Sequence, residues 1–131
     1  MKISQAVLDR LTEQAKASPL LRMNLDLRNS AEDKSQRMLN AIELGSPLPI
    51  HRHKETSETV VCLRGSLREI YYDDNGKVTE TIDLAPASDC VALNIPAGQW
   101  HTVEVLENGT VILEMKEGAY EPLQDCDVLK M

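Results

Sequence analysis

The chain has 131 residues, a length that suits one domain and leaves little room for a second. Hydrophobic residues make up 42% of it, but with no Phe, one Trp and three Tyr the core has to be built mainly from aliphatic side chains. The formal net charge of -7 argues against a nucleic-acid partner, because binding to phosphates needs clustered Lys and Arg, and against docking on an anionic membrane.

The distribution of apolar residues and cysteines predicts a cytoplasmic protein. No apolar run approaches the ~20 residues of a membrane span, and residues 1–18 are amphipathic and charged, without the apolar stretch of a secretory signal. The cysteines, Cys62, Cys90 and Cys126, are odd in number and widely spaced. We therefore expect reduced thiols and neither a disulfide framework nor a thiolate zinc site.

The N-terminal segment has the features of a helix. Ser4 is a suitable N-cap, and Ser18-Pro19 ends the helix because a residue before proline avoids helical backbone angles. The apolar residues between them recur at helical spacing: Val7, Leu8, Leu11 and Ala15. We expect residues 1–19 to form a helix that packs on the rest of the fold, with partner binding as the alternative.

After Pro19 the apolar pattern changes to the period of two that is typical of strands. The sequence predicts strands around residues 25–27 and at residues 36–44, 58–64, 66–72, 77–84, 89–95, 101–106 and 110–115. Asn75-Gly76 and Asn108-Gly109 indicate tight hairpin turns. Many short strands with frequent turns predict an all-β antiparallel sandwich or barrel, followed from residue 118 by an irregular tail.

All three histidines fall in two short segments, and this grouping predicts a metal site. His51 and His53 are two residues apart, so on a strand both imidazoles point to the same side. Glu58 follows at the entry to the next strand, and Pro96 and Gly98 form a turn that can aim a third imidazole, that of His101, inward. Three imidazoles and one carboxylate suit one divalent metal ion such as Zn, Fe, Ni or Mn. The alternative is a set of solvated surface side chains.

The same residues resemble the two motifs of the cupin superfamily. The first motif is matched at every defined position: Gly45, His51, His53, Glu58 and Gly65. The second is matched at Pro96, Gly98 and His101, but Cys90 and Val105 stand where it has Gly and Asn. The resemblance implies an antiparallel double-stranded β-helix, the jelly-roll cupin barrel, with residues 20–131 as a single cupin domain beneath the N-terminal helix.

A second resemblance covers nearly the whole chain. Residues 35–41, 49–53, 57–59 and 114–122 are similar to the WbuC family of cupin-fold metalloproteins, which are typically bacterial and often encoded among surface-polysaccharide genes. The resemblance implies metal ligands at His51, His53, Glu58 and His101. It also implies a role in bacterial surface-polysaccharide biosynthesis, with a sugar or nucleotide sugar as the small oxygen-rich ligand. Analogy to small cupins implies a homodimer.

Three functions fit such a metal site. The first is a metal-dependent enzyme, an isomerase or epimerase, or a dioxygenase if the ion is Fe(II). The second is a non-catalytic metal- and carbohydrate-binding or regulatory module. The third is a purely structural metal site, although structural zinc favours Cys-rich ligand sets. An epimerase would need a base, and the candidates by residue type are Glu43, Glu69, Glu104 and Tyr120.

Four further residues are candidates for the mouth of the barrel. Arg37 and Tyr120 lie in segments that resemble the family, and we expect them to contact substrate, with plain packing of the C-terminal arm as the alternative for Tyr120. Arg52 lies between two predicted ligands, so strand alternation directs it away from the metal. Trp100 is expected to pack at the barrel rim, with stacking on a sugar ring as the alternative.

Overall fold

The computed structural model describes residues 1–118 and 120–130. Within them the chain forms one α-helix, eight strands and a short 3-10 helix. The elements, in chain order, are α1 (Gln5–Ala17), β1 (Arg22–Asp26), β2 (Ser35–Ile42), β3 (Glu58–Arg64), β4 (Leu67–Tyr72), β5 (Val78–Leu84), β6 (Ala92–Ile95), β7 (Trp100–Val105), β8 (Thr110–Glu117) and η1 (Asp125–Asp127).

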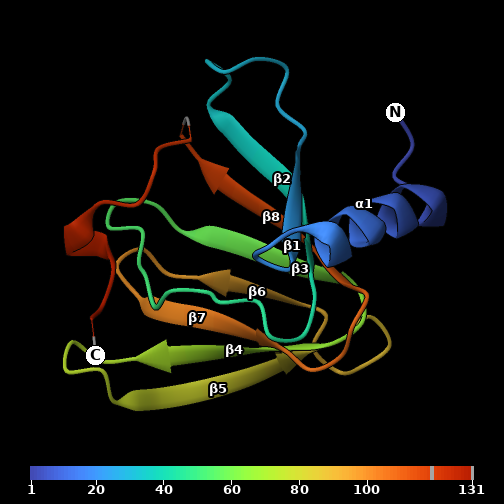
Figure 1. Ribbon diagram of the computed structural model, residues 1–131. Coiled ribbons are helices and arrows are strands. Elements are labelled where there is room, and N and C mark those ends of the chain that lie inside the picture. Colours follow the sequence, from blue (N-terminus) through green and yellow to red (C-terminus); the bar gives the residue numbers. More distant parts are fainter. Residues whose placement is uncertain (119, 131) are drawn as a thin grey trace.

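The strands form two sheets that face one another (Figure 1). The larger sheet has five strands in the order β1-β2-β8-β3-β6, and the smaller has three in the order β5-β4-β7. Every strand pairing within them is antiparallel. The prediction of an all-β antiparallel jelly roll with an N-terminal helix is confirmed.

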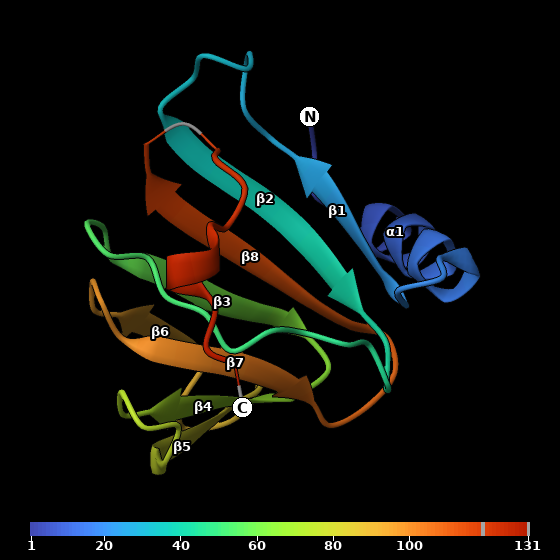
Figure 2. The ribbon, with the colours of Figure 1, turned by 60° about the vertical axis from the view of Figure 1, so that its left-hand side comes forward.

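Strand alternation gives the larger sheet two different faces, each with its own core. On the outer face α1 packs against β1, β2 and β8, as Figure 2 shows for β1 and β2. The buried residues of this outer core are Leu8, Leu11, Ala15, Leu39, Ala41 and Val111. The inner core lies between the two sheets and contains Ile42, Val60, Cys62, Leu67, Tyr71, Leu84, Ile95, Val105 and Ile112.

The helix begins and ends where local backbone chemistry requires. Ser4 is the N-cap residue with extended backbone angles, although its side chain makes no capping hydrogen bond. Ser18 leaves the helical region at φ -81° and ψ 139°, as the following proline demands. No helix of the described residues is both long and apolar enough to cross a membrane.

Two predicted strands are shorter than their apolar patterns indicate. The strand predicted at residues 36–44 ends at Ile42, because Gly45 turns the chain with φ +85° and Ser46 donates its backbone N–H to the carbonyl oxygen of Glu43. The strand predicted at residues 89–95 begins at Ala92. The Ser88 hydroxyl, which donates to the carbonyl oxygens of Ala85 and Cys90, holds the preceding residues in a turn.

Gly65 joins β3 of the larger sheet to β4 of the smaller one and has no room for a side chain. Its φ is +83°, and a Cβ atom placed there would lie 2.7 Å from the Cα of Thr110. The Thr110 hydroxyl donates to the carbonyl oxygen of Ser66 at 3.2 Å. This glycine of the first cupin motif is therefore required by close backbone packing where the two sheets connect.

Candidate metal centre

Two of the histidines are fixed side by side by their own backbones. His51, in the loop before β3, forms an antiparallel bridge with His101 of β7. Each donates its backbone N–H to the other's carbonyl oxygen, at 2.9 Å and 2.8 Å. Their ring centroids lie 4.3 Å apart. The placement of these two side chains therefore depends on main-chain hydrogen bonds rather than on flexible side-chain contacts.

The third imidazole joins them through the turn predicted from the second motif. The backbone N–H of Gly98 donates to the carbonyl oxygen of His53 at 2.7 Å. The ring of His53 then lies 5.2 Å from that of His51 and 6.0 Å from that of His101, between centroids. One ring nitrogen from each of the three lies within 4.8 Å of the others, so the cluster is able to hold a metal ion.

Hydrogen bonds at Nδ1 leave the other ring nitrogen of two histidines free. Nδ1 of His51 lies 3.1 Å from the carbonyl oxygen of Pro49, and Nδ1 of His101 lies 2.9 Å from that of Gln99. A carbonyl oxygen only accepts, so Nδ1 carries the proton and Nε2 presents a lone pair. Nε2 of His101 is buried without a hydrogen-bond partner in the described part of the chain. A bound metal ion would satisfy this atom.

Glu58 adds a carboxylate to the cluster from the first position of β3. Its Oε2 lies 2.8 Å from Nε2 of His53. Two ligands of one ion, each bonded at about 2.0–2.2 Å, lie about 3 Å apart, so this spacing suits a shared metal. Burial acts to raise the pKa of Glu58, but the hydrogen bond with His53 and the nearby imidazoles outweigh it and lower that pKa. The carboxylate is therefore ionised at neutral pH.

Burial keeps two of the histidines, His51 and His101, neutral. Burial and the neighbouring His101 lower the pKa of His51 to about 4. Burial is also the main reason that the pKa of His101 is lowered. Metal ions bind the neutral form of imidazole, so the site has ligands in the right protonation state at pH 7.

A cavity of about 210 Å³ extends from these residues into the space between the sheets. His51, Glu58 and His101 lie in its wall. The other lining residues are Arg22, Asn40, Leu48, Pro49, Glu69, Thr102, Val103, Ile112, Glu114 and Leu123. The wall of the cavity therefore combines three of the candidate metal ligands with apolar side chains and further polar groups.

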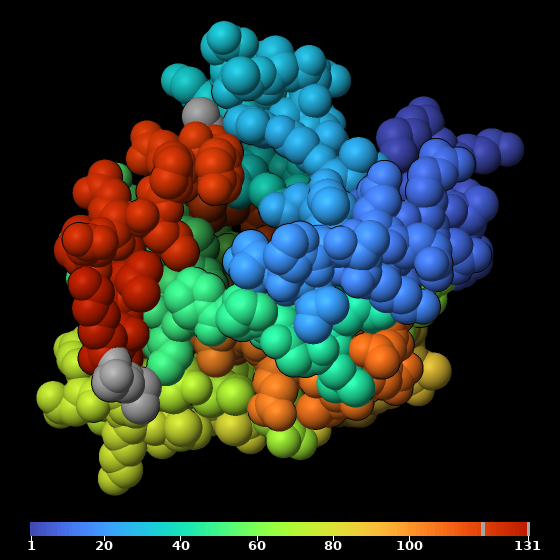
Figure 3. Space-filling view, in the orientation of Figure 1, coloured from blue at the N-terminus to red at the C-terminus, as the bar shows by residue number. Residues whose placement is uncertain are grey.

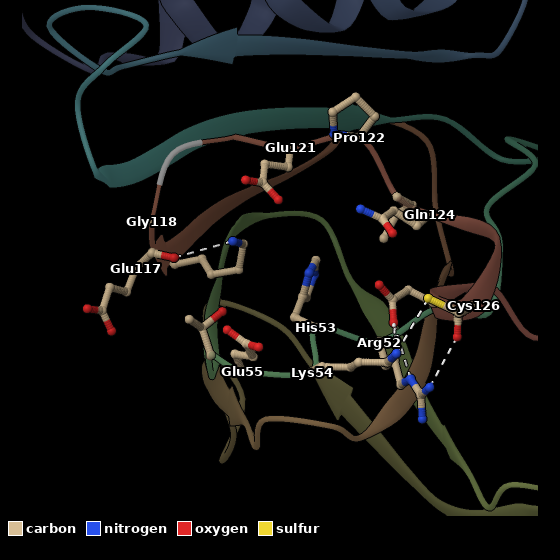
Figure 4. A pocket seen from close by; sticks show the side chains of 14 residues that line it. Arg52, His53, Lys54, Glu55, Glu117, Gly118, Glu121, Pro122, Gln124 and Cys126 are labelled. Atoms are coloured by element: carbon tan, nitrogen blue, oxygen red, sulfur yellow. Dashed lines mark hydrogen bonds and ion pairs between the residues drawn. The ribbon is translucent and has the colours of Figure 1, made fainter.

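A second pocket, of about 400 Å³, has His53 in its wall (Figure 4). It lies between residues 52–56, residues 116–118 and the C-terminal arm, which we define as residues 120–130. Arg52 donates to the carbonyl oxygen of Cys126, and Leu129 donates its backbone N–H to that of Ile50. Leu123 of the arm lines both pockets. In Figure 3 the arm, in red, lies on the surface beside the loop that carries the first two histidines.

Sequence reasoning missed two polar residues that line the cavity, Asn40 and Glu114. They face inward from β2 and β8, and Nδ2 of Asn40 donates to Oε1 of Glu114 at 3.3 Å. Burial, and then the charge of Glu58, raise the pKa of Glu114 to about 7. The available signal was strand alternation, which places Glu114 two residues from the buried Ile112 on the same face.

The base candidates occupy different places. Glu69 of β4 lines the cavity and is 2% exposed, and burial raises its pKa well above the ordinary value. Glu43 is buried elsewhere, where it accepts the backbone N–H of Gly109 at 2.6 Å. Glu104 is exposed on β7. Tyr120 is 55% exposed on the C-terminal arm, whose Leu123 lines the cavity instead.

The structure does not bring Arg37 to the histidines. In β2 it alternates with Gln36 and Met38, so it shares a face with Leu39 and not with the cavity residue Asn40. Its guanidinium pairs with the carboxylate of Asp33 at 3.2 Å.

Trp100 and Arg52 form a packed unit at the rim of the barrel. Trp100 is 7% exposed and donates its indole N–H to the carboxylate of Asp74 at 2.9 Å. The guanidinium of Arg52 lies 4.3 Å from the centre of the indole ring. The strand expected to carry His51, Arg52 and His53 is not formed, because these residues lie in the loop between β2 and β3. A buried indole covered by a guanidinium has no free face for a sugar ring.

Comparison of the sequence with protein families gives one match. A family described as "Domain of unknown function (DUF6016)" matches residues 3–84, which is more than half of the chain. The chain belongs to the DUF6016 family. No curated protein matches the sequence significantly. The matched region of this DUF6016 member includes His51, His53 and Glu58, and ends before His101.

Solved structures of cupin proteins share the fold. KdgF from Halomonas sp. superposes with a TM-score of 0.60 and 12% identity, over 79% of this chain and 84% of KdgF. Oxalate oxidase in complex with the substrate analogue glycolate gives 0.61 and 14%, over 82% and 56%. The capsular polysaccharide assembling protein CapF from Staphylococcus aureus gives 0.56 and 18%, over 82% and 34%. The chain thus spans about a third of CapF and just over half of oxalate oxidase. This member of the DUF6016 family therefore has a cupin fold.

Proposed function

We propose that this protein is a metal-dependent cupin whose ion is held by His51, His53, Glu58 and His101. The observation that carries the proposal is the convergence of three imidazoles, with nitrogens within 4.8 Å of one another, beside an ionised carboxylate. Nε2 of His101 is buried and lacks a partner among the described residues, which fits a ligand better than a solvated surface histidine. When bound, the ion supplies a Lewis acid that lowers the pKa of a coordinated hydroxyl or water.

We propose a sugar or nucleotide sugar as the substrate class, in surface-polysaccharide biosynthesis. Support comes from the segments that resemble the WbuC family and from the shared fold with CapF, which is named as a capsular polysaccharide assembling protein. The solved structures of similar fold include proteins bound to small oxygen-rich molecules, glycolate in oxalate oxidase and 3-isopropenyl-tropolone in CapF.

In an isomerase or epimerase of this kind, Glu69 is the base that the cavity offers. Of the four candidates named from the sequence, it is the one that lines the cavity, and its Oε2 has no hydrogen-bond partner among the described residues. Burial raises the pKa of Glu69 well above its ordinary value, which makes its ionised carboxylate a stronger base than that of a solvent-exposed glutamate. Its partner in the small sheet, Val103, and the apolar residues Leu48 and Ile112 also line the cavity.

The metal-loaded protein and a panel of nucleotide sugars test the proposal. We expect the panel to raise the melting temperature of the Mn- or Zn-loaded protein, and proton NMR of the stabilising sugar to show its conversion. Binding without conversion in the presence of each metal would overturn the enzymatic reading in favour of a binding module. An ion in a closed four-ligand tetrahedron, with no coordinated water, would overturn both in favour of a structural site.

We also propose that residues 20–131 form a single cupin domain covered by α1, and that two copies associate as a homodimer. Open sheet edges need to be covered, and β5, an edge of the smaller sheet, is exposed over most of its length. Light scattering coupled to size exclusion measures the mass directly. A monomer at micromolar concentration would contradict the dimer.

A further inference from the structure

We infer that the cavity beside the histidines selects an uncharged, polyhydroxylated ligand, and that Asn40 and Glu69 are the residues that make this selection. The inference rests on the proposed metal centre, since it assigns the groups that would hold the part of the ligand beyond the ion. It names residues on both sheets, one on each side of the cavity.

Two buried side-chain oxygens in the wall of the cavity lack hydrogen-bond partners in the described part of the chain. Oδ1 of Asn40 and Oε2 of Glu69 are buried and have no hydrogen-bond partner among the described residues. Asn40 is 8% exposed and Glu69 is 2% exposed, so neither atom is hydrated by bulk water. A buried oxygen left unpaired is costly, and each of these atoms can accept a hydrogen bond. A ligand that satisfies Oδ1 of Asn40 must carry a hydrogen-bond donor, and an ionised Glu69 requires a second one.

The wall of the cavity offers few N–H donors that could bind an anion. Arg22 is the one Arg or Lys among the lining residues, and its Nη1 is engaged by the carbonyl oxygen of Pro47 and the hydroxyl of Ser46. The amide nitrogen of Asn40 is taken up by Glu114. Carboxylates and phosphates are bound by arrays of N–H donors, which this cavity lacks. An ammonium ligand would be repelled by the metal ion, so a hydroxyl is the donor that fits.

The volume of the cavity and its apolar wall fit a small ring. At about 210 Å³ the cavity is smaller than the roughly 300–1,000 Å³ of sites for drug-sized ligands, so it accommodates about one small ring. Its remaining wall is apolar, with Leu48, Val103 and Ile112 available to the C–H faces of such a ring. Hydroxyl groups, unlike ionised carboxylates, can both donate and accept a hydrogen bond, so they match Glu69 in either protonation state.

Calorimetric titration of the Zn-loaded protein with a matched pair of ligands tests the inference. D-xylose and D-xylonate share a carbon skeleton and differ in charge. We expect D-xylose to bind at least tenfold more tightly than D-xylonate or oxalate. Tighter binding of either anion, or no binding of D-xylose and of D-ribose, would overturn the inference.

Two variants assign the selection to the named residues. Asn40→Leu and Glu69→Leu have nearly the same size as the wild type, and we expect each to weaken D-xylose binding at least tenfold without changing the zinc content. Glu69→Leu should also melt at a higher temperature, because it removes an unpaired buried carboxyl. Glu104→Gln, on the exposed face of β7, is the control that should bind like the wild type. Unchanged sugar affinity in both cavity variants would overturn the assignment.

The zinc content separates the two proposals. If the wild type takes up no zinc, the proposed metal centre fails, whatever the sugars do. If it takes up one zinc ion and still prefers the anions, the metal centre stands and only the selection of an uncharged ligand is contradicted.

Discussion

At the scale of residues, the interior of this barrel is unusual for how many ionisable groups it buries. Aliphatic side chains fill one end of the space between the sheets, while His51, Glu58 and His101 occupy the other together with Glu69 and Glu114. Buried ionisable groups without full pairing cost stability. In this protein the buried ionisable groups gather around one cavity, and such a cluster of buried ionisable groups is typical of functional sites.

The pH dependence of the unfolding free energy should reveal how much the buried carboxylate of Glu114 destabilises the fold. Burial raises its pKa from 4.5 to about 7, so in the metal-free protein it favours folding below about pH 4.5, and this contribution is lost as the pH rises through 7. We expect Glu114→Gln to be more stable than the wild type by about 1–3 kcal/mol at pH 8 and by less at pH 5. Urea unfolding of the metal-free proteins measures the difference.

The stability of Glu114→Gln has to be compared with that of the wild type at each pH, because the histidines change the stability of both proteins with pH in the opposite direction. The lowered pKa values of His51 and His101 make the fold lose stability as the pH falls below about 6.5, and both variant and wild type share this term. Glu80→Gln makes the same chemical change on an exposed strand and should show no such trend. A gain from Glu114→Gln that is equal at both pH values would contradict the assignment.

At the scale of elements, the strands and turns were the part of the fold that the sequence predicted best. Alternating apolar residues and Asn-Gly turns are local signals, and they located the β4–β5 hairpin. The hairpin predicted at Asn108-Gly109 is wrong, because β7 and β8, which this turn connects, lie in different sheets and do not pair. The ends of β2 and the start of β6 differ from prediction because Gly45 and the Ser88 hydroxyl act through turn geometry that an apolar pattern does not record. Spacing of His and Glu located four candidate ligands, but Asn40 and Glu114 depend on register between strands 74 residues apart.

Substitution of Gly65 tests whether close backbone packing against Thr110 is required where the two sheets are joined. Ala at this position would have an unfavourable positive φ, at a cost of about 1–2 kcal/mol, and its Cβ would also press against Thr110. We expect Gly65→Ala to cost more than 2 kcal/mol in unfolding free energy by urea titration. Gly109→Ala is the matched control, because φ there is +79° but nothing lies within 4 Å. Equal losses in the two variants would contradict the packing argument.

The helix gives a second test, since it lies on the face of the large sheet opposite the cavity. Leu11 is 4% exposed in the outer core, so Leu11→Ala should cost about 2–5 kcal/mol. Metal content should not change, because the helix contributes no lining residue to the cavity. Chemical denaturation and metal analysis of the same sample check both statements, with the exposed Gln14→Ala as control. Loss of metal in folded Leu11→Ala would show that the two faces are coupled.

At the scale of the whole molecule, the two sheets place the candidate ligands at the end of the barrel that the C-terminal arm covers. The arm pairs with residues 50–52 through Leu129 and Asp127, and it supplies Leu123 to the cavity wall. The sequence predicts only an irregular tail here, because the position of the arm is set by contacts with a distant loop and not by any local pattern. The fold and the candidate ligands could be predicted from the sequence, whereas the closure of the site could not.

Metal analysis of protein purified without chelator tests the central claim most directly. We expect about one divalent ion per wild-type chain and at least about 100-fold weaker metal binding in His53→Ala, since even residues that only orient a ligand contribute about 10–100-fold. Lys54→Ala, the exposed neighbour, should bind metal like the wild type. A wild type that takes up no ion after incubation with Zn, Mn, Ni or Fe(II), or a folded His53→Ala with unchanged affinity, would contradict the account.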